Sequence, residues 1–368
     1  MCLLATVGLT VPIGNGLGST RRLLVDFSLR TKAGPRIRYG LAAPLAAAAA
    51  ARGWLVDVAV PAGAPLPEGI NSAISLGDHS DLVLDELVLP RLAAPYDVVY
   101  TQREGLRIGR RLGRRQPGVV LHLHEHQHVR YAPSVTVRHA LRGAWQSYRA
   151  CAMYRRADHI CFSSEWTRAE FPRLERIEPT SSSVVRLGGW PDDRPPLSIM
   201  ERRPIVVVIA SSDARDELDW ALAVWRLAML PYPWELVVVG RAPHRGGERV
   251  RAVGRLSDAD LVALLAMARA YLHIGRVEGF GLSVVEALQV GTPVVGRGGS
   301  AVDELLRHGG GYLVDDAAAA ASALTALADG AVVPAVAAAA GARYTWAKTA
   351  RGVLAACDAV IECPGPAP

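Results

Sequence analysis

The chain has 368 residues, 50% of them hydrophobic, and a formal net charge of +6 at pH 7. This length predicts a large buried core and two domains. Its five cysteines are odd in number and lack the spacing of a metal or redox site, which argues for a reducing cytosol and against secretion. No apolar run is long enough to span a bilayer, and the apolar N-terminus lacks the basic region of a signal peptide.

Positive charge is concentrated in the first half of the chain. Residues 1–196 contain 25 Lys and Arg against 17 Asp and Glu, whereas the remainder contains 16 against 18. This asymmetry indicates an anionic partner or a membrane surface near the first half. The densest segment, REGLRIGRRLGRRQ (103–116), is expected to form one basic amphipathic helix, and both a solvated face and a lipid-binding face fit it. We expect a cytoplasmic protein, with peripheral contact at the inner membrane face as an option and no nucleic-acid partner.

Strand and helix patterns alternate along the chain, which predicts parallel sheets of the α/β class. The first series starts with the strand RRLLVDFSL, the loop RTKAGPRIRYG and an alanine-rich helix, and later strands are WLVDVAV, YDVVYTQ, GVVLHLH and HICFSS. A Pro/Gly-rich stretch follows, and a second series begins at RPIVVVIASS. The expected division is an extension over 1–20, a Rossmann-like domain over 21–187, a linker over 188–204, a second Rossmann-like domain over 205–345, a helix over 346–362 and a tail over 363–368.

Two glutamates, Glu278 and Glu286, flank a glycine-rich turn between a predicted strand (AYLHIG) and a predicted helix (SVVEALQVG). Gly279 and Gly281 allow tight backbone geometry and close approach of a ligand. The amides at the helix N-terminus favour a phosphate, whereas carboxylates accept hydrogen bonds from hydroxyls. A nucleotide sugar carries both groups. Helix capping by an acidic residue would explain one glutamate but not the glycines.

The segment EGFGLSVVEALQVGTPVV (278–295) resembles the E-x7-E signature of the retaining GT-B glycosyltransferases, the family-4-like glycosyl transferases group 1. The resemblance covers nearly all of residues 22–362, closely in the second half and loosely in the first. It implies two Rossmann-like domains that face an interdomain cleft, with the acceptor on the first, the donor on the second, and the helix over 346–362 packed back toward the first. The implied enzyme transfers a sugar from a nucleoside-diphosphate sugar with retention of configuration, and needs no metal or other cofactor.

The resemblance also assigns roles to single residues. The first glutamate of the signature contacts the donor sugar and the second holds the ribose, which makes Glu278 a catalytic candidate and Glu286 a nucleotide ligand. The donor-binding residues expected in this sequence are Glu286, Gly279, Phe280, Gly281, Leu282, Arg215, Gly34 and Arg255. The acceptor is expected to be a natural-product intermediate, a lipid-linked intermediate or a polysaccharide.

One departure from the family concerns charge. The Arg/Lys pair that neutralises the donor diphosphate is replaced by Ser211 and Asp216. Arg215 is the expected substitute, and further candidates are Arg241, Arg297, Arg36 and Arg38. The missing pair also supports a rival hypothesis, a non-catalytic GT-B-like module that binds a sugar or a partner protein.

Histidines alternate in LHLHEHQH, so on a continuing strand they would share one face. The family has a histidine at the end of this strand, near the reacting carbon of the donor sugar. His124 matches it best and is the second catalytic candidate, with His122 and His126 as alternatives. A zinc-hydrolase interpretation would use such pairs as ligands, but it expects further ligand motifs on later strands.

The sequence SDADL contains the D-x-D pattern that metal-dependent transferases use to hold manganese. Ser257 followed three residues later by Asp260 is also typical of a helix cap before the apolar run LVALLAMA. We interpret this pattern as a cap and predict no metal site.

Overall fold

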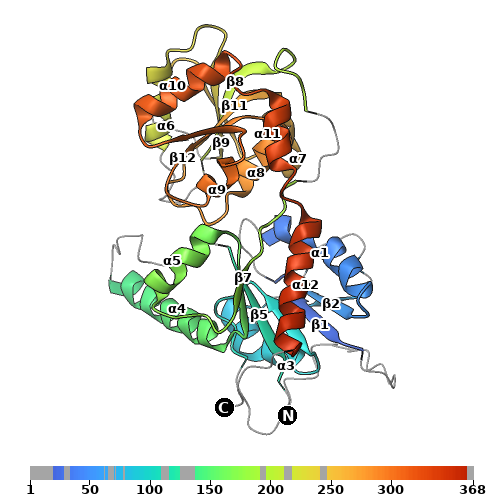
Figure 1. Cartoon of the computed structure of the whole chain (residues 1–368). Helices are drawn as coiled ribbons and strands as arrows, with labels where there is room; N and C mark the ends of the chain where they lie inside the picture. Colours follow the sequence, from blue (N-terminus) through green and yellow to red (C-terminus); the bar gives the residue numbers. More distant parts are fainter. Residues whose placement is uncertain are drawn as a thin grey trace. The chain divides into compact units, whose positions relative to one another are not determined.

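The computed structural model describes residues 20–28, 34–61, 63–64, 70, 72–77, 79–108, 116–124, 137–190, 196–210, 218–240 and 247–362. The chain divides into two compact units (Figure 1). The first comprises Met1–Ser163, Arg168–Val185 and Trp346–Pro368, and the second comprises Ser164–Thr167 and Arg186–Thr345.

The described part of the first unit contains a parallel sheet of seven strands in the order β3-β2-β1-β4-β5-β6-β7. Every side chain of β4 is buried, as expected for a central strand covered on both faces. The strands are β1 (Arg22–Asp26), β2 (Leu55–Val60), β3 (Ala73–Ser75), β4 (Val98–Thr101), β5 (Gly118–Leu123), β6 (His159–Phe162) and β7 (Ser182–Val184). The helices are α1 (Gly34–Ala50), α2 (Asp81–Val83), the π-helix η1 (Leu84–Val88), α3 (Leu89–Ala93), α4 (Val137–Arg156), α5 (Glu165–Glu175) and α12 (Trp346–Glu362).

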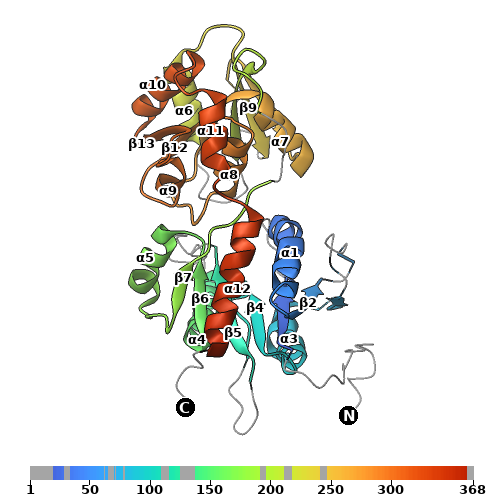
Figure 2. The same cartoon turned by 45° about the vertical axis from the view of Figure 1, so that its right-hand side comes forward.

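Helix α12 packs on the first unit although it follows the second unit in the chain. It lies beside α1 and against the sheet in both views (Figures 1 and 2). A Cβ atom at Gly40 would lie 2.2 Å from the Trp346 ring, so the close approach of the two helices requires glycine there. Asp358 of α12 accepts hydrogen bonds from Arg21 at 3.0 Å and Arg52 at 2.8 Å.

The described part of the second unit contains six parallel strands in the order β10-β9-β8-β11-β12-β13. The side chains of α6 and α10 pack with those of β8, β9 and β11 in one apolar cluster. The strands are β8 (Arg203–Ala210), β9 (Glu235–Gly240), β10 (Val250–Gly254), β11 (Ala268–His273), β12 (Val294–Arg297) and β13 (Gly311–Val314). The helices are α6 (Leu218–Ala228), α7 (Asp258–Met267), α8 (Leu282–Gln289), α9 (Val302–Leu306), α10 (Ala317–Ala328) and α11 (Pro334–Gly341).

Two local expectations were wrong. Residues 34–40 are helical rather than a loop, because α1 already begins at Gly34 and tolerates Pro35 in its first turn. The basic segment is not one continuous helix either, since its described part, residues 103–108, is irregular. The physical reason is that Arg103 is only 3% exposed and is ion-paired inside the unit.

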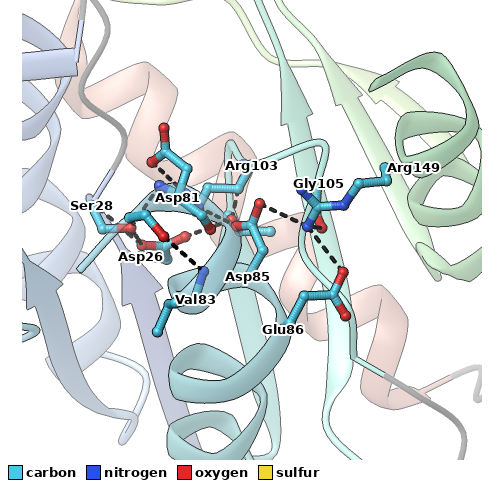
Figure 3. Close-up of polar contacts among 11 residues, drawn as sticks. Asp26, Ser28, Asp81, Val83, Asp85, Glu86, Arg103, Gly105 and Arg149 are labelled. Atoms are coloured by element: carbon cyan, nitrogen blue, oxygen red, sulfur yellow. Dashed lines mark hydrogen bonds and ion pairs between the residues drawn. The ribbon is translucent and has the colours of Figure 1, made fainter. Parts of the chain in front are cut away.

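A buried charge network fixes this irregular segment at the carboxyl ends of β1 and β4 (Figure 3). Arg103 donates through Nε to Asp85 Oδ1 at 2.6 Å, and Arg149 donates through a terminal nitrogen to Asp85 Oδ2 at 3.1 Å. Asp85 lies in η1 and is 4% exposed, and Arg149 of α4 is 6% exposed. Burial raises the pKa of Asp85, although both guanidinium groups act in the opposite direction. The pairing therefore compensates for a costly burial.

The same network reaches the first strand. Asp26, the last residue of β1, accepts a hydrogen bond from the Thr101 hydroxyl at 2.8 Å. Ser28 also donates to Asp26 and accepts a hydrogen bond from Arg103 at 3.3 Å. The ends of β1 and β4 are thus joined to η1 and α4 by hydrogen bonds among charged and hydroxyl groups.

We predict that Asp85→Ala lowers the free energy of unfolding by about 3–5 kcal/mol, because Arg103 and Arg149 stay buried without their shared partner. Urea unfolding of the full chain measures this loss. The matched control is Glu235→Ala, which removes an exposed carboxylate that contacts Arg251 at 3.5 Å. It should cost no more than about 1 kcal/mol. Equal losses in the two variants would contradict a stabilising role of the network.

Candidate functional site

The two signature glutamates lie around the connection between β11 and α8. This connection leaves the carboxyl end of a parallel strand, the edge at which open α/β sheets bind ligands. Gly281 is the N-cap residue of α8, with φ 93° and ψ 56° in the left-handed region. A Cβ atom there would also approach Leu305 Cδ1 to 3.0 Å. Both the backbone angle and the packing therefore require glycine.

Helix α8 begins with open backbone donors. No side chain caps it, and within the described part of the chain the amides of residues 279–283 form no hydrogen bond. An α-helix N-terminus with free amides carries a partial positive charge and binds anions. The loop EGFGL therefore presents free backbone donors, which is the arrangement that an anion site requires.

The two glutamates differ in exposure. Glu286, in the second turn of α8, is 2% exposed, whereas the Glu278 side chain, just before the helix, is 30% exposed. Phe280 lies between them in sequence with its ring buried edge-on against Tyr344, at a centroid distance of 5.9 Å. The site thus combines a buried carboxylate, a partly exposed carboxylate and a set of free amides on one short segment.

The other expected donor residues are more scattered. Arg255 is exposed in the connection between β10 and α7, and Gly34 begins α1 in the first unit. Arg297 ends β12, is 9% exposed, and lies over the Trp220 ring at 4.6 Å. Arg215 lies outside the described residues, as do Ser211, Asp216 and Arg241.

Sequence reasoning missed His273, the last residue of β11. Its Nδ1 lies 3.2 Å from the Tyr271 hydroxyl, which in turn donates to Ser283 Oγ at 2.9 Å. Its Nε2 is buried without a hydrogen bond and lies 3.6 Å from Glu278 Oε2. Burial lowers the pKa of His273 to about 4, so the ring is neutral at pH 7. A histidine at a strand end gave no distinct signal in the sequence.

The histidines of the first unit are distinguished by their hydrogen bonds. His122 uses both ring nitrogens, with Nδ1 at 2.8 Å from the Tyr100 hydroxyl and Nε2 at 2.9 Å from the Val185 carbonyl. His124 is half-buried as a residue, but both its ring nitrogens are covered and lack hydrogen-bond partners in the described chain. Burial lowers the pKa of His124 to about 3. His126 and His128 lie outside the described residues.

The capping interpretation of SDADL is confirmed. Ser257 Oγ accepts a hydrogen bond from the Asp260 amide at 3.1 Å and donates to Asp260 Oδ2 at 2.6 Å, at the first turn of α7. One of the two aspartates of the D-x-D pattern is therefore engaged in helix capping.

The second unit carries the family match. Residues 203–329 match the model of the family described as Glycosyl transferases group 1. This part of the second unit is therefore a glycosyl transferases group 1 domain. The predicted α/β class and GT-B-type fold are confirmed by the two parallel sheets and by the likeness to a solved structure. That structure, HepE from Anabaena in complex with UDP and glucose, has a TM-score of 0.67 at 16% identity, over 92% of this chain and 100% of that chain.

Two curated mannosyltransferases are also similar to this chain in sequence. A phosphatidyl-myo-inositol mannosyltransferase from Mycobacterium leprae is 36% identical over 137 residues, which are 33% of this chain and 36% of the relative. The O-antigen chain mannosyltransferase B from Escherichia coli is 23% identical over 229 residues, which are 50% of this chain and 60% of the relative. The chain thus spans less than two thirds of each curated relative. No helix in the described residues has the length and apolar character needed to cross a membrane.

The buried neutral histidines predict a pH dependence of stability. Below pH 6.5 the unfolded chain binds a proton on His273, whereas the folded chain binds it only below about pH 4. The free energy of unfolding should therefore fall as the pH falls through this window, by up to about 1.4 kcal/mol per pH unit for each such group. His273→Gln should reduce the slope of unfolding free energy against pH by the contribution of one titrating group. Urea unfolding at a series of pH values measures this slope. His308→Gln, at an exposed histidine of the same unit, is the matched control. An unchanged slope in His273→Gln would contradict the neutral, buried state of this ring.

Proposed function

We propose that the protein transfers a hexosyl unit from a nucleoside-diphosphate sugar to an acceptor hydroxyl, with retention of the anomeric configuration. The observation that carries this proposal is the run of five unpaired amides at residues 279–283, flanked by Glu278 and Glu286. Free amides match a diphosphate, and carboxylates match hydroxyls. The names of the two curated relatives support a mannosyl donor, and the complex of HepE supports a uridine nucleotide.

The proposed mechanism relies on positioning and electrostatics. The amides of α8 bind the diphosphate, Glu286 holds the ribose, and Glu278 accepts hydrogen bonds from the donor sugar. The acceptor oxygen attacks the anomeric carbon from the side of the leaving group while the bond from that carbon to the phosphate oxygen breaks. The acceptor proton passes to the departing phosphate, so no nucleophile of the protein is needed.

We also propose roles for four residues outside the EGFGL segment. His124 would face the donor sugar, because its ring nitrogens have no hydrogen-bond partner in the described chain. Gly34 would allow close approach of the ligand in the first unit, and Arg255 would lie toward the nucleotide base. Arg215 would supply the cation for the leaving group. The basic first half would bind the acceptor, and the relatives' names support a lipid-linked or polysaccharide acceptor at a membrane surface.

Thermal-shift measurements with UDP-, GDP-, TDP- and ADP-sugars test the donor directly, because a ligand that binds the folded state raises its melting temperature. Donor hydrolysis and transfer are then measured with each stabilising sugar nucleotide. Stabilisation without any hydrolysis or transfer would favour the sugar-binding module. No stabilisation by any of the four would contradict the proposed function.

The two glutamates should separate nucleotide binding from turnover. Glu286→Ala should weaken binding of the free nucleoside diphosphate about tenfold or more, because hydrogen bonds to a charged acceptor contribute roughly 1.5–3 kcal/mol. Glu278→Ala should lower the transfer rate while the affinity for the free diphosphate stays near that of the wild type. Isothermal titration with UDP and GDP measures the affinities, and Glu235→Ala is the control glutamate in the same unit. Unchanged affinity in Glu286→Ala would remove its ribose role.

His124→Ala should reduce the transfer rate sharply and leave the affinity for the free nucleoside diphosphate nearly intact. The matched control is His159→Ala in the same sheet, because His159 is also buried but its two ring nitrogens lie within 2.9 Å of the Ser181 and Ser183 hydroxyls. That variant should affect stability more than turnover. If chelators abolish activity and added zinc restores it, the histidines form a metal site and the assignment is wrong.

A further inference from the structure

Two buried hydroxyls hold the glycine-rich loop from a distant part of the sequence. Ser164 Oγ donates to the Gly279 carbonyl at 2.7 Å, and Thr167 Oγ1 donates to the same oxygen at 2.8 Å. Ser164 is 1% exposed and Thr167 is fully buried. All three residues belong to the second unit, because the short segment Ser164–Thr167 groups with it.

Counting the hydroxyl protons shows that either hydroxyl alone is enough to hold the Gly279 carbonyl. The two hydroxyl oxygens also lie 2.7 Å apart, so three contacts share only two hydroxyl protons. If each hydroxyl donates to the carbonyl, Gly279 receives two hydrogen bonds. If one hydroxyl donates to the other, the second is still placed to donate to Gly279. In each arrangement of these three contacts the carbonyl keeps a hydrogen bond, and the remaining hydroxyl is in place to donate when the other is removed alone.

The anchored carbonyl determines where the next amide points. A peptide unit is planar and trans, so the C=O of Gly279 and the N–H of Phe280 point in opposite directions. The preceding unit is held in the same way, because the Glu278 carbonyl accepts a hydrogen bond from the Ala301 amide at 3.1 Å. With both carbonyls held, the amides of Gly279 and Phe280 are directed away from these anchors and form no hydrogen bond in the described chain.

We propose that Ser164 and Thr167 are positioning residues of the diphosphate site. Neither touches the ligand. They hold the Gly279–Phe280 peptide in the orientation that binds phosphate before the nucleotide arrives, which lowers the ordering cost of a loop rich in glycine. The inference rests on the proposed function and adds to it the source of the site's rigidity.

The test compares single and double removal of the hydroxyls. Ser164→Ala and Thr167→Val alone should each weaken binding of the free nucleoside diphosphate only slightly, since the other hydroxyl then donates to Gly279. The double variant should weaken it about tenfold, a loss larger than the two single losses combined. The double variant Ser164→Thr with Thr167→Ser keeps both hydroxyls and should bind like the wild type. Isothermal titration with UDP and GDP measures the affinity for the nucleoside diphosphates. Titration with uridine and guanosine measures the part of the affinity that does not involve phosphate.

A purely structural role would give a different pattern. Thr292→Val serves as the control, because Thr292 is also buried in the second unit and donates to the Leu265 carbonyl, but follows the other end of α8. It should lower the melting temperature and leave diphosphate binding unchanged. The inference is overturned if the double variant binds UDP or GDP like the wild type, or if it loses nucleoside binding to the same extent. If the wild type binds neither diphosphate, the proposed function itself fails.

Discussion

The left-handed conformation of Gly281 starts α8 in a way that leaves five consecutive amides without partners. Glycine adopts this backbone angle without strain, but polar groups without partners cost free energy and persist only where the surroundings hold them in place. Here the enforcement comes from three sides. The hydroxyls of Ser164 and Thr167 hold one carbonyl, the Ala301 amide holds the previous one, and the Phe280 ring is buried against Tyr344. The site is ordered by contacts that leave its binding groups untouched.

The carboxyl edges of the two sheets differ in how their polar groups are paired. At the edge of the first sheet, Arg103 and Arg149 share Asp85, while Arg149 Nε and both ring nitrogens of His124 have no hydrogen-bond partner in the described chain. At the edge of the second sheet, backbone donors are left open and His273 Nε2 has no hydrogen bond. Buried polar groups are normally paired, so the unpaired donors at the second edge support the proposed diphosphate site, as the His124 nitrogens support the proposed sugar contact.

The sequence was sufficient where the determining contacts are local. The turn and helix of EGFGLSVVEAL, the parallel α/β class and the Ser257 cap follow from residues a few positions apart. It was not sufficient where a contact joins distant segments. Ser164 hydrogen-bonds to Gly279 although the two are 115 positions apart in the sequence, and no local sequence pattern indicates such a pair. The basic segment after β4 was misjudged for the same reason, because the charge pattern does not reveal that Asp85 buries Arg103.

Charge balance gives the last constraint on the proposed site. A helix N-terminus supplies only about half an elementary charge, too little for a departing diphosphate. Arg297 ends a strand at the same edge, where its guanidinium lies over the Trp220 ring and the residue is only 9% exposed. In the sheet order, β8 directly neighbours β11, whereas β9 is one strand further away. Arg215 follows β8 in the sequence and Arg241 follows β9, and β11 leads to Glu278. Sheet order therefore favours Arg215 over Arg241 as the proposed cation for the leaving group.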